Sequence, residues 1–251
     1  MSNSSQDSFF FCVMLKAVIF DLDGVVADSH PIHEVAWKGL LAEAGLDPRT
    51  INVDYLYAGH PRREILKHYL GSIGDSEMQH WGRRKDELYE MAAKALQAKP
   101  GIARVLSQLR HSGIACALAT SAGRKRSLES LELLGLSGFF SAIITGDDVR
   151  KAKPAPDIFL LATQKLDVQP GNVVVVEDSV AGVQAAIAGG MKCVGYTAPE
   201  RAEELRRVGA DDVISDFPED SVHYFQSVAS PMDSTDLPLS SARAKISRQR
   251  C

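Results

Sequence analysis

The chain has 251 residues, of which 45% are hydrophobic and 24% charged, and its formal net charge is −4. This composition is typical of an ordinary globular chain of one large or two small domains. The weak negative charge, without blocks of like charge, argues against a nucleic acid or a membrane as partner. The cysteines are scattered without metal-ligand spacing, which favours buried thiols and a cytoplasmic location: Cys12, Cys116, Cys193 and Cys251.

Residues 1–13 precede the first predicted strand and are interpreted as an N-terminal extension. The apolar run at residues 9–15 is short and lacks a basic leader. It therefore predicts neither a signal peptide nor a membrane span.

Six short apolar runs predict β-strands. Their apolar residues are continuous rather than alternating, which is typical of parallel strands covered by helices on both faces. The chain between them has helical patterns that begin or end at Gly101, Gly135 and Ser179. We therefore expect an α/β fold with a doubly wound, mostly parallel sheet. The runs are Lys16–Phe20, Ile114–Ala119, Ala142–Thr145, Val173–Glu177, Cys193–Tyr196 and Asp212–Ile214.

Residues 31–98 interrupt this alternation, because they carry helical patterns and no strand signal. We interpret them as an all-helical domain inserted into a core made of residues 14–30 and 99–222. From residue 223 onward we expect a mobile C-terminal tail, because the chain becomes rich in serine from Ser227 and contains Pro231 and Pro238.

Polar side chains follow four of the predicted strands or the segment after them. In a doubly wound sheet the carboxyl ends of the strands open into one crevice, so we expect these side chains to meet there. They are Asp21 and Asp23 after the first strand, Thr120 and Ser121 after the second, Lys153 after the third, and Glu177 and Asp178 at the end of the fourth.

The segments "DLDGVVADS", "ATSAG", "KAKPAPDIF" and "VVEDSVAGVQAA" resemble, in order, the four motifs of the haloacid dehalogenase superfamily in its phosphatase and phosphomutase branch. The resemblance covers about residues 15–216. The helical insertion lies where that family places its cap domain. The resemblance implies a Rossmann-like core and phosphoryl transfer to or from a small phosphorylated metabolite.

Phosphoryl transfer needs an in-line nucleophile, a proton for the leaving oxygen and positive charge around the phosphate. We expect Asp21 to be the nucleophile, because its carboxylate is ionised at neutral pH and forms an aspartyl phosphate. Asp23 would act as general acid and then base. Thr120 with the amides of Ser121 and Ala122, and the ammonium of Lys153, would bind the phosphate oxygens. A pair of solvated turn aspartates is the alternative for Asp21 and Asp23.

Carboxylates and a phosphate dianion need a hard cation between them, so Mg²⁺ is the expected cofactor. Asp21, the backbone carbonyl of Asp23 and Asp178 would bind it, with Glu177 bound either to the metal through water or to the ligands from behind. Capping of a helix is the alternative for the segment 177–179, and also for Asp28 and Ser29.

The cap would select the substrate. "HEVAW", residues 33–37, resembles an element shared by β-phosphoglucomutases and several sugar phosphatases, which implies that His33 lies near Asp23 and that Trp37 contacts the substrate. Arg62 and Lys85 fall where the mutases bind a second phosphate, although both could equally be surface residues. Five of the seven histidines lie between His30 and His80, but their spacing does not predict a zinc site.

Two departures from the mutases favour a phosphatase. Ala58 and Gly123 stand where mutases carry lysines, although Arg124 or Lys125 could compensate for Gly123. A β-phosphoglucomutase-like enzyme is the alternative, and a non-catalytic protein that binds phosphorylated ligands is a more remote one. We expect a monomer or a weak homodimer.

Overall fold

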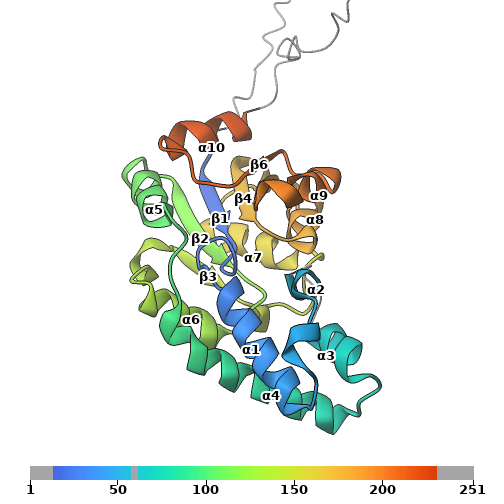
Figure 1. Cartoon of the computed structure of the whole chain (residues 1–251). Helices are drawn as coiled ribbons and strands as arrows, with labels where there is room; N and C mark the ends of the chain where they lie inside the picture. Colours follow the sequence, from blue (N-terminus) through green and yellow to red (C-terminus); the bar gives the residue numbers. More distant parts are fainter. Residues whose placement is uncertain (1–13, 58–61, 231–251) are drawn as a thin grey trace, which may run out of the picture.

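The computed structural model describes residues 14–57 and 62–230. The predicted extension, Ala58 and residues 231–251 of the predicted tail lie outside these residues. Six parallel strands form one sheet in the order β3-β2-β1-β4-β5-β6 (Figure 1). The fold-class prediction is confirmed, and each predicted strand is correct to within one residue at either end. The strands are β1 Ala17–Phe20, β2 Ala115–Ala119, β3 Ala142–Ile144, β4 Val173–Glu177, β5 Lys192–Tyr196 and β6 Asp212–Ile214.

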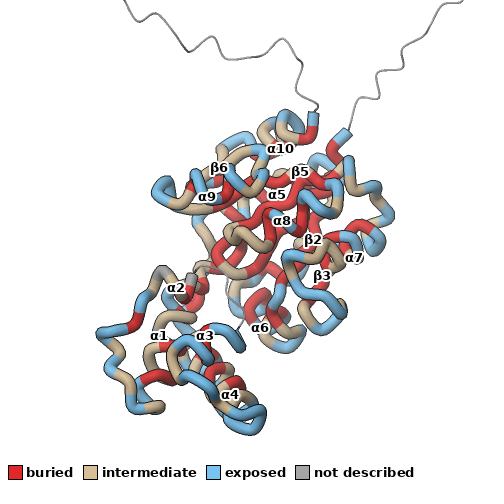
Figure 2. The backbone as a smooth tube through the Cα atoms, turned by 90° about the vertical axis from the view of Figure 1, so that its right-hand side faces the viewer, coloured by how far each residue is buried: buried red, intermediate tan, exposed pale blue. Residues whose placement is uncertain are grey.

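Helices cover both faces of the sheet, which explains why the strands are apolar throughout. On β1, Val18 and Phe20 pack on one face with α5 and α10, whereas Ala17 and Ile19 pack on the other with α7, α8 and α9. Figure 2 shows the buried residues concentrated in this central layer. The helices of the core are α5 Ile102–His111, α6 Arg124–Leu133, α7 Asp157–Leu166, α8 Val180–Ala188, α9 Ala202–Arg207 and α10 Ser221–Ala229. Short 3₁₀ helices join several elements: η3 Ser137–Phe139, η4 Gly146–Asp148, η5 Pro170–Asn172 and η6 Pro199–Arg201.

Within the described residues of the inserted domain, helices are the only regular elements, and the domain lies beside the carboxyl edge of the sheet (Figure 1). It has a small apolar core of its own, in which Trp37, Leu40 and Leu41 pack against Ile65 and Leu66. Its elements are α1 His30–Glu43, η1 Pro48–Thr50, α2 Val53–Tyr57, α3 Arg62–Leu70, α4 Asp75–Ala92 and η2 Ala93–Ala95.

The two chain segments that join this cap to the core run antiparallel and are hydrogen-bonded to each other. The Asp28 N–H donates to the Gln97 carbonyl at 2.8 Å, and the Lys99 N–H donates to the Val26 carbonyl at 2.9 Å. The side chain of Asp28 accepts from Lys99 at 3.0 Å. Ser29 precedes α1 without a side-chain capping bond. Ser29 thus stands at the N-cap position but does not cap α1 with its side chain, and the Asp28 carboxylate binds Lys99 of the returning segment instead.

The predicted tail begins too early. Residues 223–229 belong to α10, which Asp220 caps by accepting from the His223 N–H at 3.1 Å. Phe225 is fully buried and its ring meets Phe20 edge-on, with the ring centroids 6.3 Å apart. A helix of only nine residues has a weak sequence signature, and only its packing against the sheet shows that it belongs to the core.

We expect Phe225→Ala to lower the free energy of unfolding by about 3 kcal/mol, because it removes a fully buried ring and leaves a cavity. Urea denaturation would measure this, with the exposed Gln226→Ala on the same helix as the control. Equal stability of the two variants would contradict the assignment of α10 to the core.

Candidate active site

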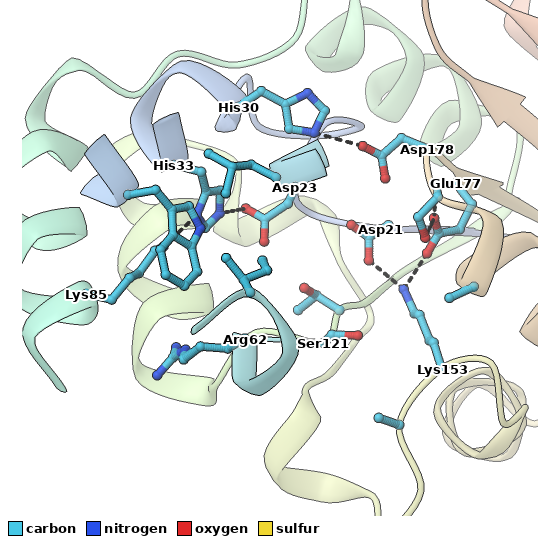
Figure 3. A pocket seen from close by; sticks show the side chains of 17 residues that line it. Asp21, Asp23, His30, His33, Arg62, Lys85, Ser121, Lys153, Glu177 and Asp178 are labelled. Atoms are coloured by element: carbon cyan, nitrogen blue, oxygen red, sulfur yellow. Dashed lines mark hydrogen bonds and ion pairs between the residues drawn. The ribbon is translucent and has the colours of Figure 1, made fainter. Parts of the chain in front are cut away.

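The carboxyl ends of β1 and β4 lie side by side where the strand order reverses. A cavity of about 430 Å³ opens there, between the sheet and the cap (Figure 3). Every predicted site residue except Ala122 lines it: Asp21, Asp23, His33, Trp37, Arg62, Lys85, Thr120, Ser121, Lys153, Glu177 and Asp178. The fold therefore brings together residues that lie up to 157 positions apart in the chain (Asp21 to Asp178).

Lys153 forms the floor of the cavity. Its Nζ donates to Asp21 Oδ1 at 2.6 Å, to Glu177 Oε1 at 2.5 Å and to the Ala119 carbonyl at 3.1 Å (Figure 3). Burial by itself lowers the pKa of Lys153, but Asp21 and Glu177 outweigh this effect and raise it. Lys153 is therefore a fixed positive charge at neutral pH, with all three ammonium protons in use.

Glu177 is bound from two sides. Its Oε2 accepts from the N–H and from the hydroxyl of Ser179, both at 2.9 Å. The hydroxyl of Ser179 in turn caps α8 by accepting from the Gly182 N–H at 3.0 Å. A Cβ at Gly182 would collide with the Glu177 carboxylate, so this helix position needs glycine. The segment 177–179 thus both caps a helix and supplies site carboxylates.

The donor set suits a hard divalent cation. Burial raises the pKa of Asp21 well above its usual value, and the charges of Glu177, Asp178 and Asp23 raise it further against the opposing effect of Lys153. A cation beside Asp21 and Asp178 would relieve this repulsion, and oxygen ligands favour Mg²⁺. Among the described residues, no three acidic, histidine or cysteine side chains are grouped closely enough to hold an ion by themselves. Backbone oxygen or water would have to complete the coordination.

Asp23 is held in place from the core and from the cap. Arg126 of α6 donates to its two oxygens at 2.9 and 2.6 Å, and His33 Nε2 lies 3.4 Å from Oδ1. Burial by itself raises the pKa of Asp23, but Arg126 and His33 outweigh it and keep the pKa well below the usual value. Asp23 is therefore a carboxylate in this arrangement.

His33 connects Asp23 to a buried lysine, Lys85. His33 Nδ1 and Lys85 Nζ are 2.6 Å apart. Burial and the charge of Lys85 lower the pKa of His33 to about 4, and burial with the charges of Arg126 and Arg62 lowers the pKa of Lys85 to about 7. The contacts fit a neutral His33 whose Nε2–H points to Asp23 and whose Nδ1 accepts from Lys85. The Lys85 ammonium also lies 5.6 Å from the centre of the Trp37 ring.

The end of β2 contributes the opposite wall. Thr120 and Ser121 line the cavity, and Thr120 is almost fully buried. The Ala122 N–H donates to Thr120 Oγ1 at 3.1 Å. Ala122 does not line the cavity, because its side chain is buried in the apolar core.

Sequence reasoning missed two side chains. The first is His30, whose Nε2 lies 3.1 Å from Asp178 Oδ2. Both side chains pack against Gly24, where a Cβ would collide with the Asp178 carboxylate. Arg126 was overlooked in favour of its neighbours. Arg124 pairs with Asp148 and Lys125 with Glu90, whereas Arg126 binds Asp23 from outside the cavity lining. Successive helical residues point about 100° apart, so only the placement of α6 shows which base reaches Asp23.

The sequence pattern of haloacid dehalogenase-like hydrolases matches residues 18–196. The protein belongs to this family. It is 36% identical over 180 residues to a phosphorylated carbohydrates phosphatase of Thermotoga maritima, and the matched region covers 71% of this chain and 83% of that protein. It is 35% identical over 191 residues to the β-phosphoglucomutase of Bacillus subtilis, covering 72% of this chain and 83% of that protein.

A solved structure agrees with this haloacid dehalogenase assignment. The crystal structure of a β-phosphoglucomutase from Clostridium difficile superimposes with a TM-score of 0.74 at 27% identity, covering 86% of this chain and 97% of that chain. Relatives of both kinds, phosphatase and mutase, are thus similar to this chain. Membership of the haloacid dehalogenase family shows that this protein is an enzyme. The residues of its site must decide between phosphatase and mutase activity.

We expect Arg126→Gln to lower the free energy of unfolding at pH 7 by about 2 kcal/mol, because it removes two charge-assisted hydrogen bonds from Asp23. Because the pKa of Asp23 is depressed in the folded state, its ionised carboxylate stabilises the fold at pH values above its usual pKa of about 3.9. This stabilisation is lost as the pH falls from that value through the lower pKa of the folded state. The deficit of the variant should therefore shrink below about pH 4.

Denaturation of both proteins between pH 7 and pH 3 would measure this difference. Arg124→Gln, which breaks an exposed ion pair on the same helix, is the control and should cost about 0.5 kcal/mol or less. A deficit for Arg126→Gln that is absent at pH 7, or that grows toward acid, would contradict the role of Arg126.

Proposed function

We propose that the protein is a Mg²⁺-dependent phosphatase that hydrolyses a small phosphorylated sugar or a similar metabolite through an aspartyl phosphate on Asp21. The observation that carries the proposal is the position of Asp21, whose carboxylate is bound by Lys153 at the base of a cavity that cap residues line on the opposite side. The named relatives act on phosphorylated carbohydrates. We further propose a monomer or weak homodimer in the cytoplasm, where the buried free thiols of Cys116 and Cys193 would remain reduced.

In this proposal the Asp21 carboxylate attacks phosphorus, and the bond from phosphorus to the sugar oxygen breaks. Asp23, once it has taken up a proton from solvent, gives that proton to the sugar oxygen. It then takes a proton from the water that attacks the aspartyl phosphate and releases inorganic phosphate. The Thr120 hydroxyl and Ser121 hold the phosphoryl oxygens, and Lys153 joins them by exchanging one of its three present acceptors for the phosphate. Because Arg126 keeps Asp23 ionised in the arrangement seen, the acid step requires this pair to loosen when substrate is bound.

Asp21, Asp178 and the backbone carbonyl of Asp23 would hold the Mg²⁺, whose charge would offset that of the phosphate and the carboxylates. Glu177 would act through water, because both of its oxygens already accept hydrogen bonds from Lys153 and Ser179.

A phosphomutase is the second candidate, because Arg62 and Lys85 line the cavity. Such an enzyme must bind a bisphosphate and shield the aspartyl phosphate from water. Against it, Gly123 offers no side chain, and the neighbouring Arg124 and Lys125 are paired with Asp148 and Glu90.

The test is to incubate the protein with Mg²⁺, β-glucose 1-phosphate and a trace of glucose 1,6-bisphosphate, and to follow the products by phosphorus NMR, alongside a panel of other sugar monophosphates. We expect inorganic phosphate from at least one of them. Asp21→Asn should lower this release by about a thousandfold or more while leaving the fold intact. Glucose 6-phosphate without free phosphate would instead indicate a mutase, and binding without turnover would indicate a non-catalytic protein.

We expect Mg²⁺ at about one hundred times its dissociation constant to raise the melting temperature at pH 7 by about 5 °C, because it binds only the folded state. Asp178→Asn should lose most of this increase, whereas the exposed Glu219→Gln should keep it. Because the pKa of Asp21 is raised, its protonation competes with the ion, and the increase should fade as the pH is lowered. Differential scanning calorimetry would measure it, and an unchanged melting temperature of the original protein would contradict the metal site.

A further inference from the structure

The far end of the cavity contains an arginine that is already occupied. Arg62, the first residue of α3, donates from Nη1 to Asp86 Oδ2 at 3.0 Å and from Nη2 to Asp86 Oδ1 at 2.7 Å. Nη1 also donates to the Gly82 carbonyl at 3.2 Å. In Figure 3 the guanidinium of Arg62 is turned away from the catalytic carboxylates.

The two acceptors belong to one face of one helix. Gly82 and Asp86 are four residues apart on α4, so the carbonyl of one and the carboxylate of the other reach the same guanidinium. A planar guanidinium and a carboxylate match in shape, and a bidentate pair of this kind fills the donors that a phosphate would otherwise use.

A second phosphate would therefore have to displace a carboxylate and remain beside its negative charge. The other base near this end is also engaged, because Lys85 is buried and lies 2.6 Å from His33 Nδ1. Of the two positive charges at this end of the cavity, that of Arg62 is therefore balanced by Asp86, whereas the neutral His33 holds Lys85 in place without balancing its charge.

We propose that Asp86 is a specificity-determining residue that occupies Arg62 and thereby restricts the cavity to substrates with one phosphate and an uncharged, hydroxylated far end. This inference rests on the proposed function and narrows its substrate class. Asp86 acts through Arg62 and is a positioning residue rather than a catalytic one.

The remaining walls at this end fit such a substrate. Trp37, Leu56 and Ile65 line the cavity beside Arg62 and offer apolar surface to the carbon-bound hydrogens of a sugar or polyol. Arg62 itself lines the cavity, and its guanidinium can exchange hydrogen bonds with hydroxyl groups without a change of net charge.

The test compares Asp86→Asn with Asp86→Glu, which keeps the carboxylate, and with Glu87→Gln, which removes the neighbouring acid on α4. All three are made in the Asp21→Asn background, so that bound ligand is not consumed. Isothermal titration calorimetry in Mg²⁺ buffer measures binding of glucose 6-phosphate and of glucose 1,6-bisphosphate.

For Asp86→Asn we expect affinity for the bisphosphate to rise about tenfold relative to the monophosphate, because one negative charge next to the second phosphate is gone. Asp86→Glu and Glu87→Gln should keep the original ratio. Adding Arg62→Gln to Asp86→Asn should abolish the gain, which a merely structural effect of Asp86 would not predict.

An unchanged ratio in Asp86→Asn, or an equal gain for both ligands, would overturn the role of Asp86 and leave the proposed phosphatase standing. Failure of every variant to bind either sugar phosphate would overturn the proposed substrate class and this inference together.

Discussion

The site depends on one buried ammonium group, Lys153, placed between the carboxylates of Asp21 and Glu177. Buried charges are tolerated when they are paired and hydrogen-bonded, and here three acceptors from the ends of β1, β2 and β4 converge on one Nζ. The same arrangement leaves an excess of negative charge around Asp21, since Asp178 and Asp23 lie close enough to raise its pKa. The need for a cation and for a phosphate-binding ammonium thus arises from one cluster.

Asp23 is where the two domains meet. The core contributes Arg126, whose bidentate pair keeps the carboxylate ionised, and the cap contributes His33, which is supported by Lys85. A second histidine of α1, His30, contacts Asp178. Two side chains near the start of one cap helix therefore touch two carboxylates of the core, so the position of the cap and the state of these carboxylates are physically linked.

Charge balance within the cap narrows what the cavity can bind. Arg62 is neutralised by Asp86 and so presents no free cation to a second phosphate, whereas Lys85 is buried and contacts His33. At the base of the cavity, by contrast, Lys153 is a permanent positive charge. One end is therefore suited to a phosphoryl group and the other to an uncharged sugar.

The sequence alone determined the parallel sheet, the helical insertion and the positions of Asp21, Thr120, Lys153 and Glu177, because apolar runs and strand ends are local features that a linear pattern records. It did not determine which base of α6 reaches Asp23, which acid neutralises Arg62, or that Phe225 belongs to the core. Each of these is a contact between residues more than twenty positions apart. Such contacts depend on how helices pack against the sheet and against each other, which only the tertiary structure decides.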